Sequence, residues 1–459
     1  MQSPFPFHSI LLFGFLAILL LIGVVLRARV PFFQKFLFPS CLIGGVLGLI
    51  LVNTGLVHFS AHGLETFAYH LFNISFISVG LTRGREEHNT SGHKKEVVKG
   101  SLWMALTQGV TFPLQAAIGG LTVLFFSLFG LKLFPTFGFL VPLGFNEGPG
   151  QALSFGKVWE TVGFNHAATL GLGFAAVGYF FAFFVGVPLV NHWIRKGPSA
   201  QGTRALSRDF MVGITARDQK RESAGELTLH SANTDSLAFQ AALVGLVYVL
   251  TYFFVKYFGK VLPSDAGKML WGFFFLFGLA LAICVRWLME KMGLEYLVDR
   301  GIQRRITGLS VDFLIVATVA AIQVLVVWTY IVPFLTISLA SGVLTTFVVL
   351  FLGRRLPSYN IERTVAIYGT VTGTVSCGLL LLRIADPEFQ TPVALEMAIM
   401  NVFVVPIVGG CTVLVNGPLW WHWSTAFTVL VFAVIMAASL TVIKILGLWT
   451  KPPLNSLPH

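Results

Sequence analysis

Long apolar runs separated by short polar segments dominate the sequence. The runs 10–26 and 426–443 are each close to the roughly 20 apolar residues that a helix needs to cross the hydrocarbon core of a bilayer. The first run follows a stretch without positive charge and lacks a small-residue cleavage pattern, so it is expected to be a membrane helix and not a signal peptide. The pattern predicts an all-α, polytopic membrane protein with helices at 9–27, 36–56, 64–82, 98–131, 163–194, 236–258, 267–290, 308–331, 333–353, 390–415 and 422–447.

Two apolar segments, 136–161 and 361–387, are interrupted by polar and helix-breaking residues. In the first, the Gly-Pro-Gly at 148–150 prevents a continuous helix. In the second, glycines alternate with threonines and serine over 369–378. Backbone that leaves the helix at membrane depth is tolerated only where protein covers it or where it lines a wet cavity. Each segment is therefore predicted to be a re-entrant hairpin; an ordinary loop with turn residues is the alternative.

The positions of the basic residues favour hairpins over loops. Five polar segments hold 23 of the 31 lysines and arginines: 27–35, 83–99, 195–221, 286–305 and 354–363. Basic loops lie on the cytoplasmic side, and all five can do so only if both hairpins return to the side they entered from. This places the N-terminus outside and the C-terminus in the cytoplasm. Two further charges, Lys157 and Glu160, fall late on the first hairpin and are expected to be solvated near the outer surface.

Four predicted helices precede each hairpin and one follows it, so each unit crosses the membrane five times. An odd number of crossings turns the second unit upside down relative to the first, which is the inverted-repeat layout of secondary transporters. Short matches in the same order support the repeat, such as VTFPLQAAIGG at 110–120 and YIVPFLTISLASG at 330–342. The expected organisation is an N-terminal repeat at 1–195, a cytoplasmic linker at 196–235, a C-terminal repeat at 236–418, and an extra helix with a tail at 419–459.

Composition mainly excludes other classes of protein. Apolar residues make up 55% of the chain and charged residues 11%, and the mean hydropathy is +0.80, whereas a soluble domain carries about 25% charged residues. The net charge of +11 would suit nucleic acid, but the basic residues fall between apolar runs, so no nucleic-acid partner is expected. The four cysteines lie singly in apolar segments without metal-site spacing. We expect no cofactor and no enzyme activity.

The hairpin tips carry the candidate binding chemistry. The half-helix after each tip points its free N–H groups at the tip, and such an end attracts carboxylates. Freed carbonyls and hydroxyls nearby suit a hard cation such as sodium. The candidate substrate-binding residues are Asn146, Glu147, Gly148, Gly150, Gln151, Thr372, Gly373, Thr374, Ser376 and Arg383, and the candidate ion ligands are Ser75, Ser78, Glu147, Asp312 and Asn401.

Charged residues inside membrane segments indicate function because their burial is unfavourable. Glu147 is expected to bind sodium, carry a proton or pair with a cationic group of the substrate; the alternative is a structural ion pair that holds the hairpin shut. Arg383 is a candidate clamp for a substrate carboxylate, or else extends to the cytoplasmic surface. Asp312 is a candidate cation ligand, or else a helix cap. Glu396 is expected to face the second hairpin.

Several stretches are typical of one known family: PFFQKFLFPSCLIGGVLGLIL at 31–51, FISVGL at 76–81, NEGPGQAL to HWIRKG within 146–197, LVDRGIQRRITGLSVDFLIVATVAA at 297–321 and FVVPIVGG at 403–410. Through them the chain resembles a divergent member of the bacterial sodium/glutamate symporter family over most of its length. The motif around the first hairpin is the most specific. Glu147 stands where that family has a histidine, Asp312 where it has a serine, and Arg383 where it has a neutral residue.

The resemblance implies a homodimer in the bacterial inner membrane, in which a transport domain moves as an elevator against a scaffold. It also implies sodium-coupled uptake of an acidic amino acid. The expected function is therefore symport of glutamate or a related small organic anion, with sodium as the first choice of coupling ion and protons as the second. The alternatives are a transporter for another carboxylate or amino acid, and an ion channel whose two half-helices meet at a filter.

Overall fold

The computed structural model describes residues 7–82, 93–196, 208–217, 223–230, 232–262, 267–268, 270–386 and 391–449, and within them all regular structure is helical. The longer helices are α1 (His8–Arg29), α3 (Ser40–Asn53), α4 (Ala61–Leu81), α5 (His93–Leu128), α7 (Pro149–Glu160), α8 (Ala167–Phe180), α9 (Gly186–Lys196), α11 (Ser236–Val261), α13 (Phe274–Lys291), α14 (Arg300–Ala320), α16 (Ile331–Gly353), α17 (Asn360–Thr372), α18 (Val375–Ala385), α19 (Val393–Leu414) and α21 (Thr425–Ile445). The shorter helices are α2 (Pro31–Lys35), α6 (Leu140–Phe145), α10 (Arg208–Val212), α15 (Val324–Thr329) and α20 (Gly417–Trp420), with 3₁₀ turns η1 (Phe137–Phe139), η3 (Leu270–Phe273) and η4 (Glu295–Leu297) and a π turn, η2 (Phe181–Val185).

Eight helices of the described residues are long and apolar enough to cross a membrane. They are α1, α5, the continuous α8–α9, α11, α13 with the preceding turn η3, α16, α19 and α21. A chain with this many spanning helices is a multi-pass membrane protein, as the apolar runs predict.

Two predicted spans differ from the structure in extent. The segment 36–56 is helical only from Ser40 to Asn53, after Pro39, and the segment 308–331 contains the end of α14 and the separate α15. The side chain of Asn53 explains the second break. It donates to the Ile322 carbonyl and accepts from the Val324 N–H, both at 2.9 Å. These bonds satisfy backbone groups that the interrupted helix leaves open.

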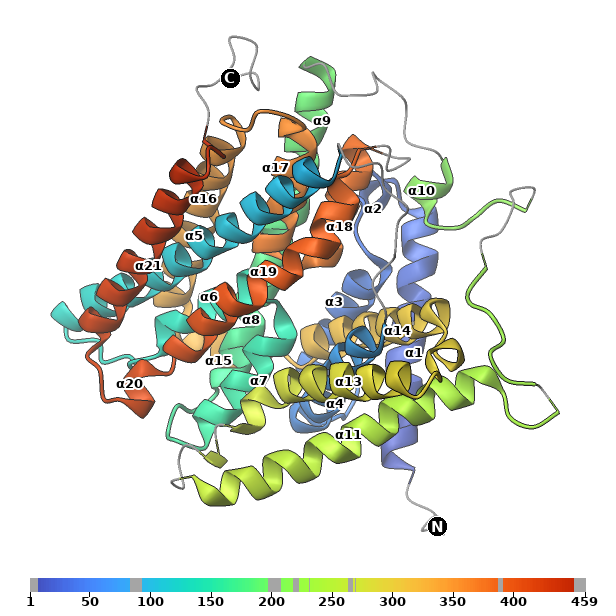
Figure 1. Cartoon of the computed structure of the whole chain (residues 1–459). Helices are drawn as coiled ribbons and strands as arrows, with labels where there is room; N and C mark the ends of the chain where they lie inside the picture. Colours follow the sequence, from blue (N-terminus) through green and yellow to red (C-terminus); the bar gives the residue numbers. More distant parts are fainter. Residues whose placement is uncertain are drawn as a thin grey trace.

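The long helices pack in two groups (Figure 1). The first helix group consists of α1, α3, α4, α11, α13 and α14, and the second of α5 to α9, α16 to α19 and α21. In Figure 1, α5, α16 and α21 run side by side at one edge of the molecule, away from α11, α13 and α14. Each group contains helices from the N-terminal and from the C-terminal half of the chain, so the two halves pack against each other in both groups. The inverted relation between the two halves stays a prediction.

Both interrupted segments are helical hairpins. Helices α6 and α7 reverse the chain around 146–148, and α17 and α18 reverse it around 373–374. The longest of these helices has 13 residues, too few to cross a bilayer. The two ends of the first hairpin lie together, since the rings of Phe134 and Phe164 stack with centroids 4.7 Å apart. The chain therefore leaves the first hairpin where it entered, which the positions of the basic residues require.

Several basic segments meet at one end of the molecule. Arg27, near the end of α1, donates to the carbonyl of Phe38 at 3.0 Å and to that of Phe210 in α10 at 3.1 Å. The guanidinium of Arg383, in the last turn of α18, lies 5.2 Å from the centre of the Phe210 ring. We call the end of a hairpin opposite its tip the foot. The foot of the second hairpin therefore lies next to the end of α1 and the linker helix α10, in agreement with basic loops on one face.

Arg363 falls within the predicted basic loop 354–363. In the structure it is instead a buried residue of helix α17. Its Nε donates to Glu396 Oε2 at 2.8 Å and its Nη2 to Oε1 at 2.5 Å. Its Nη1 donates to the carbonyl and the hydroxyl of Ser358, both at 2.9 Å. Gly100 of α5 leaves room for this pair, because a Cβ there would overlap the Glu396 carboxylate. Glu396 thus faces the second hairpin, as predicted, and fixes its foot to α5 and α19.

The first hairpin predicts a labelling pattern. In a variant without native cysteines, Gly130→Cys and Asn165→Cys should react with a membrane-impermeant maleimide from the same side of sealed vesicles, because the hairpin ends lie together. Gly447→Cys, after α21, should react from the other side. Labelling of positions 130 and 165 from opposite sides would contradict the hairpin.

The buried pair predicts a large loss of stability on removal of one partner. Glu396→Gln should lower the free energy of unfolding by about 3–5 kcal/mol, because it leaves the buried Arg363 charge uncompensated. The control, Glu290→Gln, removes a partly exposed partner of Arg286 at 3.7 Å and should cost at most about 1 kcal/mol. Unfolding in mixed detergent micelles measures both, and equal losses would rule out this role of the pair.

Candidate functional site

The tips of the two hairpins touch. Gly148 has φ +94° and ψ −177°, a conformation essentially restricted to glycine. A Cβ on Gly148 would lie 2.8 Å from Thr374 Cγ2 and 3.4 Å from the Gly373 carbonyl oxygen. Gly178 of α8 approaches both tips, because a Cβ there would overlap the Thr372 carbonyl and lie 3.4 Å from Phe145 Cα. Glycine is thus required where the two reversals and α8 come together.

Both tips present the start of a helix. Helix α7 begins after Gly148 and α18 begins after Thr374, and neither N-cap residue accepts a hydrogen bond from the first turn through its side chain. The Thr374 hydroxyl points instead at Cys377 Sγ, 3.7 Å away. The first N–H groups of both helices are therefore available to an anion, and the two helix dipoles add positive potential at the same place.

Glu147 lies half-buried at the first tip. Its carboxylate accepts a hydrogen bond from the Thr412 hydroxyl of α19 at 2.5 Å. Across the described ranges no lysine, arginine or histidine forms an ion pair with Glu147, so the alternative of a structural ion pair has no partner there. The carboxyl group is held in place without an ion-pair partner among the described residues.

Thr111 and Gln115, one turn apart on α5, bring polar groups to both tips. Asn146 Nδ2 donates to Thr111 Oγ1 at 2.9 Å. Gln115 Nε2 donates to the Val371 carbonyl and to Thr345 Oγ1, both at 3.1 Å. The amide oxygens Asn146 Oδ1 and Gln115 Oε1 are buried and accept no hydrogen bond from the residues that the structure describes. Buried oxygens without donors are unfavourable in a protein and suit a bound cation.

Sequence reasoning missed Thr111, Gln115, Thr345 and Thr412. The available signal was a pair of polar residues one turn apart in an apolar helix, as at Thr111 and Gln115. Such faces meet protein and not lipid. The signal is weak on its own, because threonine hydroxyls in membrane helices commonly bond to their own backbone, as Thr412 does to the Val408 carbonyl at 2.8 Å.

Asp312 lies on the side of the first helix group that faces the second tip. Its carboxylate accepts a hydrogen bond from the Cys41 thiol of α3, and Cys41 lies near Cys377 in the first turn of α18. The alternative role as a helix cap is wrong, because α14 starts at Arg300 and Asp299 caps it by accepting from the Ile302 N–H at 2.7 Å. A role as cation ligand stays a prediction.

Three other candidate ion ligands form hydrogen bonds elsewhere. Ser75 donates to the Phe72 carbonyl of its own helix at 2.7 Å, and Ser78 donates to the Gln303 carbonyl of α14 at 2.7 Å. Asn401 is exposed on α19 and donates to the Met397 carbonyl at 3.4 Å. Among the described residues, none of the three side chains forms a hydrogen bond with either tip.

Arg383 lies away from the tips. It is exposed in the last turn of α18, nine residues after Thr374, which is about 13 Å along a helix. Its contact with Phe210 of the linker helix fits the alternative in which it extends to the surface. A clamp on a carboxylate between the tips does not fit this position.

The remaining candidates belong to the tips in different ways. Gly150 packs on Phe72, whose ring a Cβ would overlap, and Gln151 is buried in the first turn of α7. The Thr372 hydroxyl donates to the Tyr368 carbonyl at 2.7 Å and is unavailable as a donor. Ser376 is exposed in the first turn of α18. The structure therefore brings the candidate glycines and first-turn residues to the tips. The Thr372 hydroxyl, in contrast, is already bonded to its own helix.

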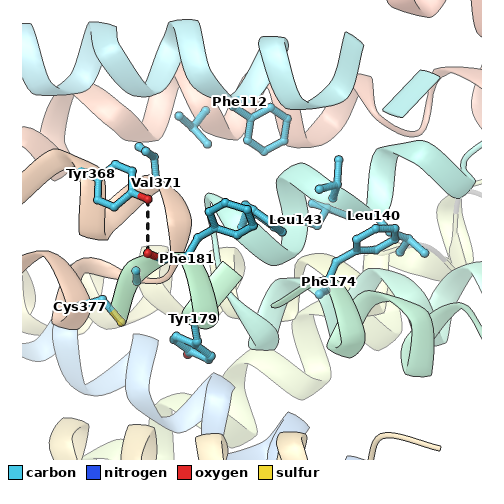
Figure 2. Close-up of a cluster of buried hydrophobic side chains, with 14 of the residues drawn as sticks. Phe112, Leu140, Leu143, Phe174, Tyr179, Phe181, Tyr368, Val371 and Cys377 are labelled. Atoms are coloured by element: carbon cyan, nitrogen blue, oxygen red, sulfur yellow. Dashed lines mark hydrogen bonds between the residues drawn. The ribbon is translucent and has the colours of Figure 1, made fainter. Parts of the chain in front are cut away.

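Apolar side chains from α5, α8 and the arms of both hairpins pack together (Figure 2). Phe112, Phe174 and Phe181 fill the space between α5, α8 and the hairpins, and all are buried. The Tyr368 hydroxyl donates to the Phe181 carbonyl at 3.3 Å, next to the π turn η2. Apolar surroundings of this kind lower the local polarity, so charges and helix dipoles at the tips act more strongly than they would in solution.

Lys157 and Glu160, expected to be solvated, are partly exposed (34% and 25%) and also belong to an ion-pair network. Lys157 Nζ lies 2.6 Å from Glu65 Oε2 and 3.0 Å from Glu160 Oε2. Glu65, on α4 of the first helix group, is only 3% exposed, and Glu160 Oε1 accepts from the Ala168 N–H at 3.1 Å. The network joins the second arm of the first hairpin to the first helix group.

Within the described part of the chain, no three His, Cys, Asp or Glu side chains cluster in a way that could hold a metal ion. Comparison with protein-family models finds no match, and neither does comparison with curated proteins. The resemblance to the sodium/glutamate symporters therefore stays a prediction based on the sequence motifs.

The tip contact predicts a specific effect of a methyl group. Gly148→Ala should reduce any transport activity by about tenfold or more, because its Cβ displaces Thr374. Gly163→Ala is a matched control: Gly163 has φ +99°, but a Cβ there meets nothing within 4 Å. Both residues have a positive φ, so both variants carry backbone strain, on the order of 1–3 kcal/mol at a position such as Gly148. Equal activities, measured at equal amounts of folded protein, would refute the importance of the contact.

Proposed function

We propose that the protein is a secondary active transporter whose substrate, a small organic anion such as glutamate, binds where the hairpin tips meet. The observation that carries the proposal is the contact of Gly148 with Thr374, which brings together the uncapped starts of α7 and α18. Two helix N-termini that converge in apolar surroundings attract an anion. The substrate is moved and not chemically changed.

A dicarboxylate suits this arrangement better than a monocarboxylate. One carboxylate accepts hydrogen bonds from the first N–H groups of α7, at Gly150 and Gln151. The second accepts from those of α18, at Ser376 and Cys377. The charge of each carboxylate then faces the positive end of one helix dipole. This geometry supports an acidic amino acid as substrate; the runner-up is another carboxylate or amino acid.

Sodium is the first choice of coupling ion. Glu147, Asn146 and Gln115 each place an oxygen near the tips, and sodium, a hard cation, prefers oxygen ligands. A carboxylate next to an anionic substrate repels it unless a cation neutralises one of them. Binding of the cation and the anion is then mutually dependent, which is the basis of symport. A proton on Glu147 would have the same effect and is the second choice.

Alternating access follows from the division into two helix groups. The second group, which carries both hairpins, moves as an elevator against the first, and contacts such as Lys157 with Glu65 break and re-form. The basic end lies in the cytoplasm of a bacterial cell, with the N-terminus outside and the C-terminus inside. The homodimer is proposed from the family resemblance alone.

An ion channel is the rival from another class, because two half-helices that meet could also form a filter. Uptake into proteoliposomes separates the two. A symporter accumulates labelled glutamate, aspartate or a dicarboxylate with saturation, and only with an inward sodium or proton gradient. A channel instead conducts ions without any of these substrates. Conductance without substrate-dependent accumulation would refute the proposal.

The variant Glu147→Gln tests the coupling site in the same vesicles. It should raise the sodium concentration for half-maximal uptake by about tenfold, equivalent to roughly 1.4 kcal/mol, or abolish sodium dependence. Thr412→Val, which removes the hydrogen bond to Glu147, should shift it in the same direction by less. Wild-type sodium dependence and rate in Glu147→Gln would exclude Glu147 from coupling.

A further inference from the structure

A cavity of about 320 Å³ opens where α5 begins and α21 ends, far from the hairpin tips. Lys95, Glu96 and Lys99 of α5 form one wall. Ser358, just before α17, and Arg363 of α17 form another, and Leu448 closes the cavity after α21. The cavity lies at the foot of the second hairpin, at the basic end of the molecule. It is separate from the proposed transport site.

The cavity carries uncompensated positive charge. Lys95 and Lys99 are four residues apart, so they share one face of α5, and both are exposed. In the part of the chain that the structure describes, neither lysine forms an ion pair. Arg363 pairs with Glu396 and lies 3.9 Å from Glu96, whose Oε1 also accepts a hydrogen bond from Ser358 at 2.7 Å. The Glu96 carboxylate thus also lines the cavity, and together with Glu396 it offsets two of the three positive charges. The net positive charge comes from the exposed lysines, which are the groups that an anion would meet.

Neighbouring side chains place the cavity at the level of the lipid headgroups. The rings of Phe351 and Trp449 make an edge contact with centroids 5.6 Å apart. The guanidinium of Arg355 lies 3.6 Å from the Phe351 ring centre and 5.3 Å from that of Trp449. Tryptophan and arginine at helix ends are typical of the membrane interface.

An apolar surface continues from the cavity along the membrane-spanning helices. Phe347 of α16 is 67% exposed and Ile445 of α21 is 76% exposed. Both helices pack against α5, at the same edge of the molecule in Figure 1. A ligand with a charged head and long acyl chains fits such a surface, whereas a small soluble anion would use only the lysines.

We propose that Lys95 and Lys99 bind the phosphate of an anionic phospholipid whose acyl chains lie along α16 and α21. Each lysine near a membrane surface contributes about 1 kcal/mol to the binding of anionic lipid. The lipid occupies the groove between the start of α5, the end of α21 and the foot of the second hairpin. This site does not depend on what the protein transports.

The test uses delipidated full-length protein in a neutral detergent and measures the shift of its thermal unfolding midpoint as lipid is titrated. Phosphatidylglycerol should stabilise the wild type more than phosphatidylcholine does. The double variant Lys95→Gln/Lys99→Gln should bind phosphatidylglycerol roughly 10- to 30-fold more weakly. Lys95→Arg/Lys99→Arg, which keeps the charge, should retain binding.

The control Lys256→Gln/Lys260→Gln removes equal charge from the last turns of α11, where both lysines are exposed, and should leave the lipid effect unchanged. Three outcomes would overturn the proposal. The double glutamine variant could keep the full preference for phosphatidylglycerol, the α11 control could lose as much of it, or inorganic phosphate alone could reproduce the stabilisation.

Discussion

The structure depends on one constraint, that backbone N–H and C=O groups inside a membrane protein need partners. Where the helices break, side chains usually provide them. The Asn53 side chain hydrogen-bonds to the backbone groups in the gap between α14 and α15. The Gln115 side chain donates to the Val371 carbonyl at the end of α17, and the Tyr368 hydroxyl donates to the Phe181 carbonyl. The starts of α7 and α18 receive no side-chain cap, which is also true of α3, α8, α16, α17 and α19. What distinguishes these two starts is that they lie together where the two tips touch.

Close approach of backbones makes that point possible. Gly148 and Gly178 let the tips and α8 meet without Cβ atoms between them, and Gly369 does the same between the arms of the second hairpin, where a Cβ would lie 2.7 Å from the Cys377 carbonyl oxygen. Phenylalanine side chains then fill the space around the contact. Small residues set the geometry of the site, while large apolar ones pack around it.

Charge is distributed differently at the feet and at the tips of the hairpins. At the feet, Arg363 pairs with Glu396 and Lys157 pairs with Glu65, so the hairpins are anchored by compensated charges. At the tips, Glu147 has hydrogen bonds from the side chains of Thr412 and Gln151, and among the described residues it has no ion-pair partner. A carboxylate held without an ion-pair partner is a position from which a cation can be bound and released, which compensated pairs do not allow.

The sequence by itself determined most of the helices and the two hairpin breaks, but not the break between α14 and α15. These features follow from length, hydropathy and the backbone restrictions of glycine and proline, which act over a few residues. It also identified Glu147 and the glycines of both tips. Only the tertiary structure decided that Gly148 meets Thr374, that Thr111 and Gln115 face the tips, and that Arg383 does not. Contacts between distant segments depend on which faces of the helices pack together, and a local pattern of polar and apolar residues does not specify the partner of each face.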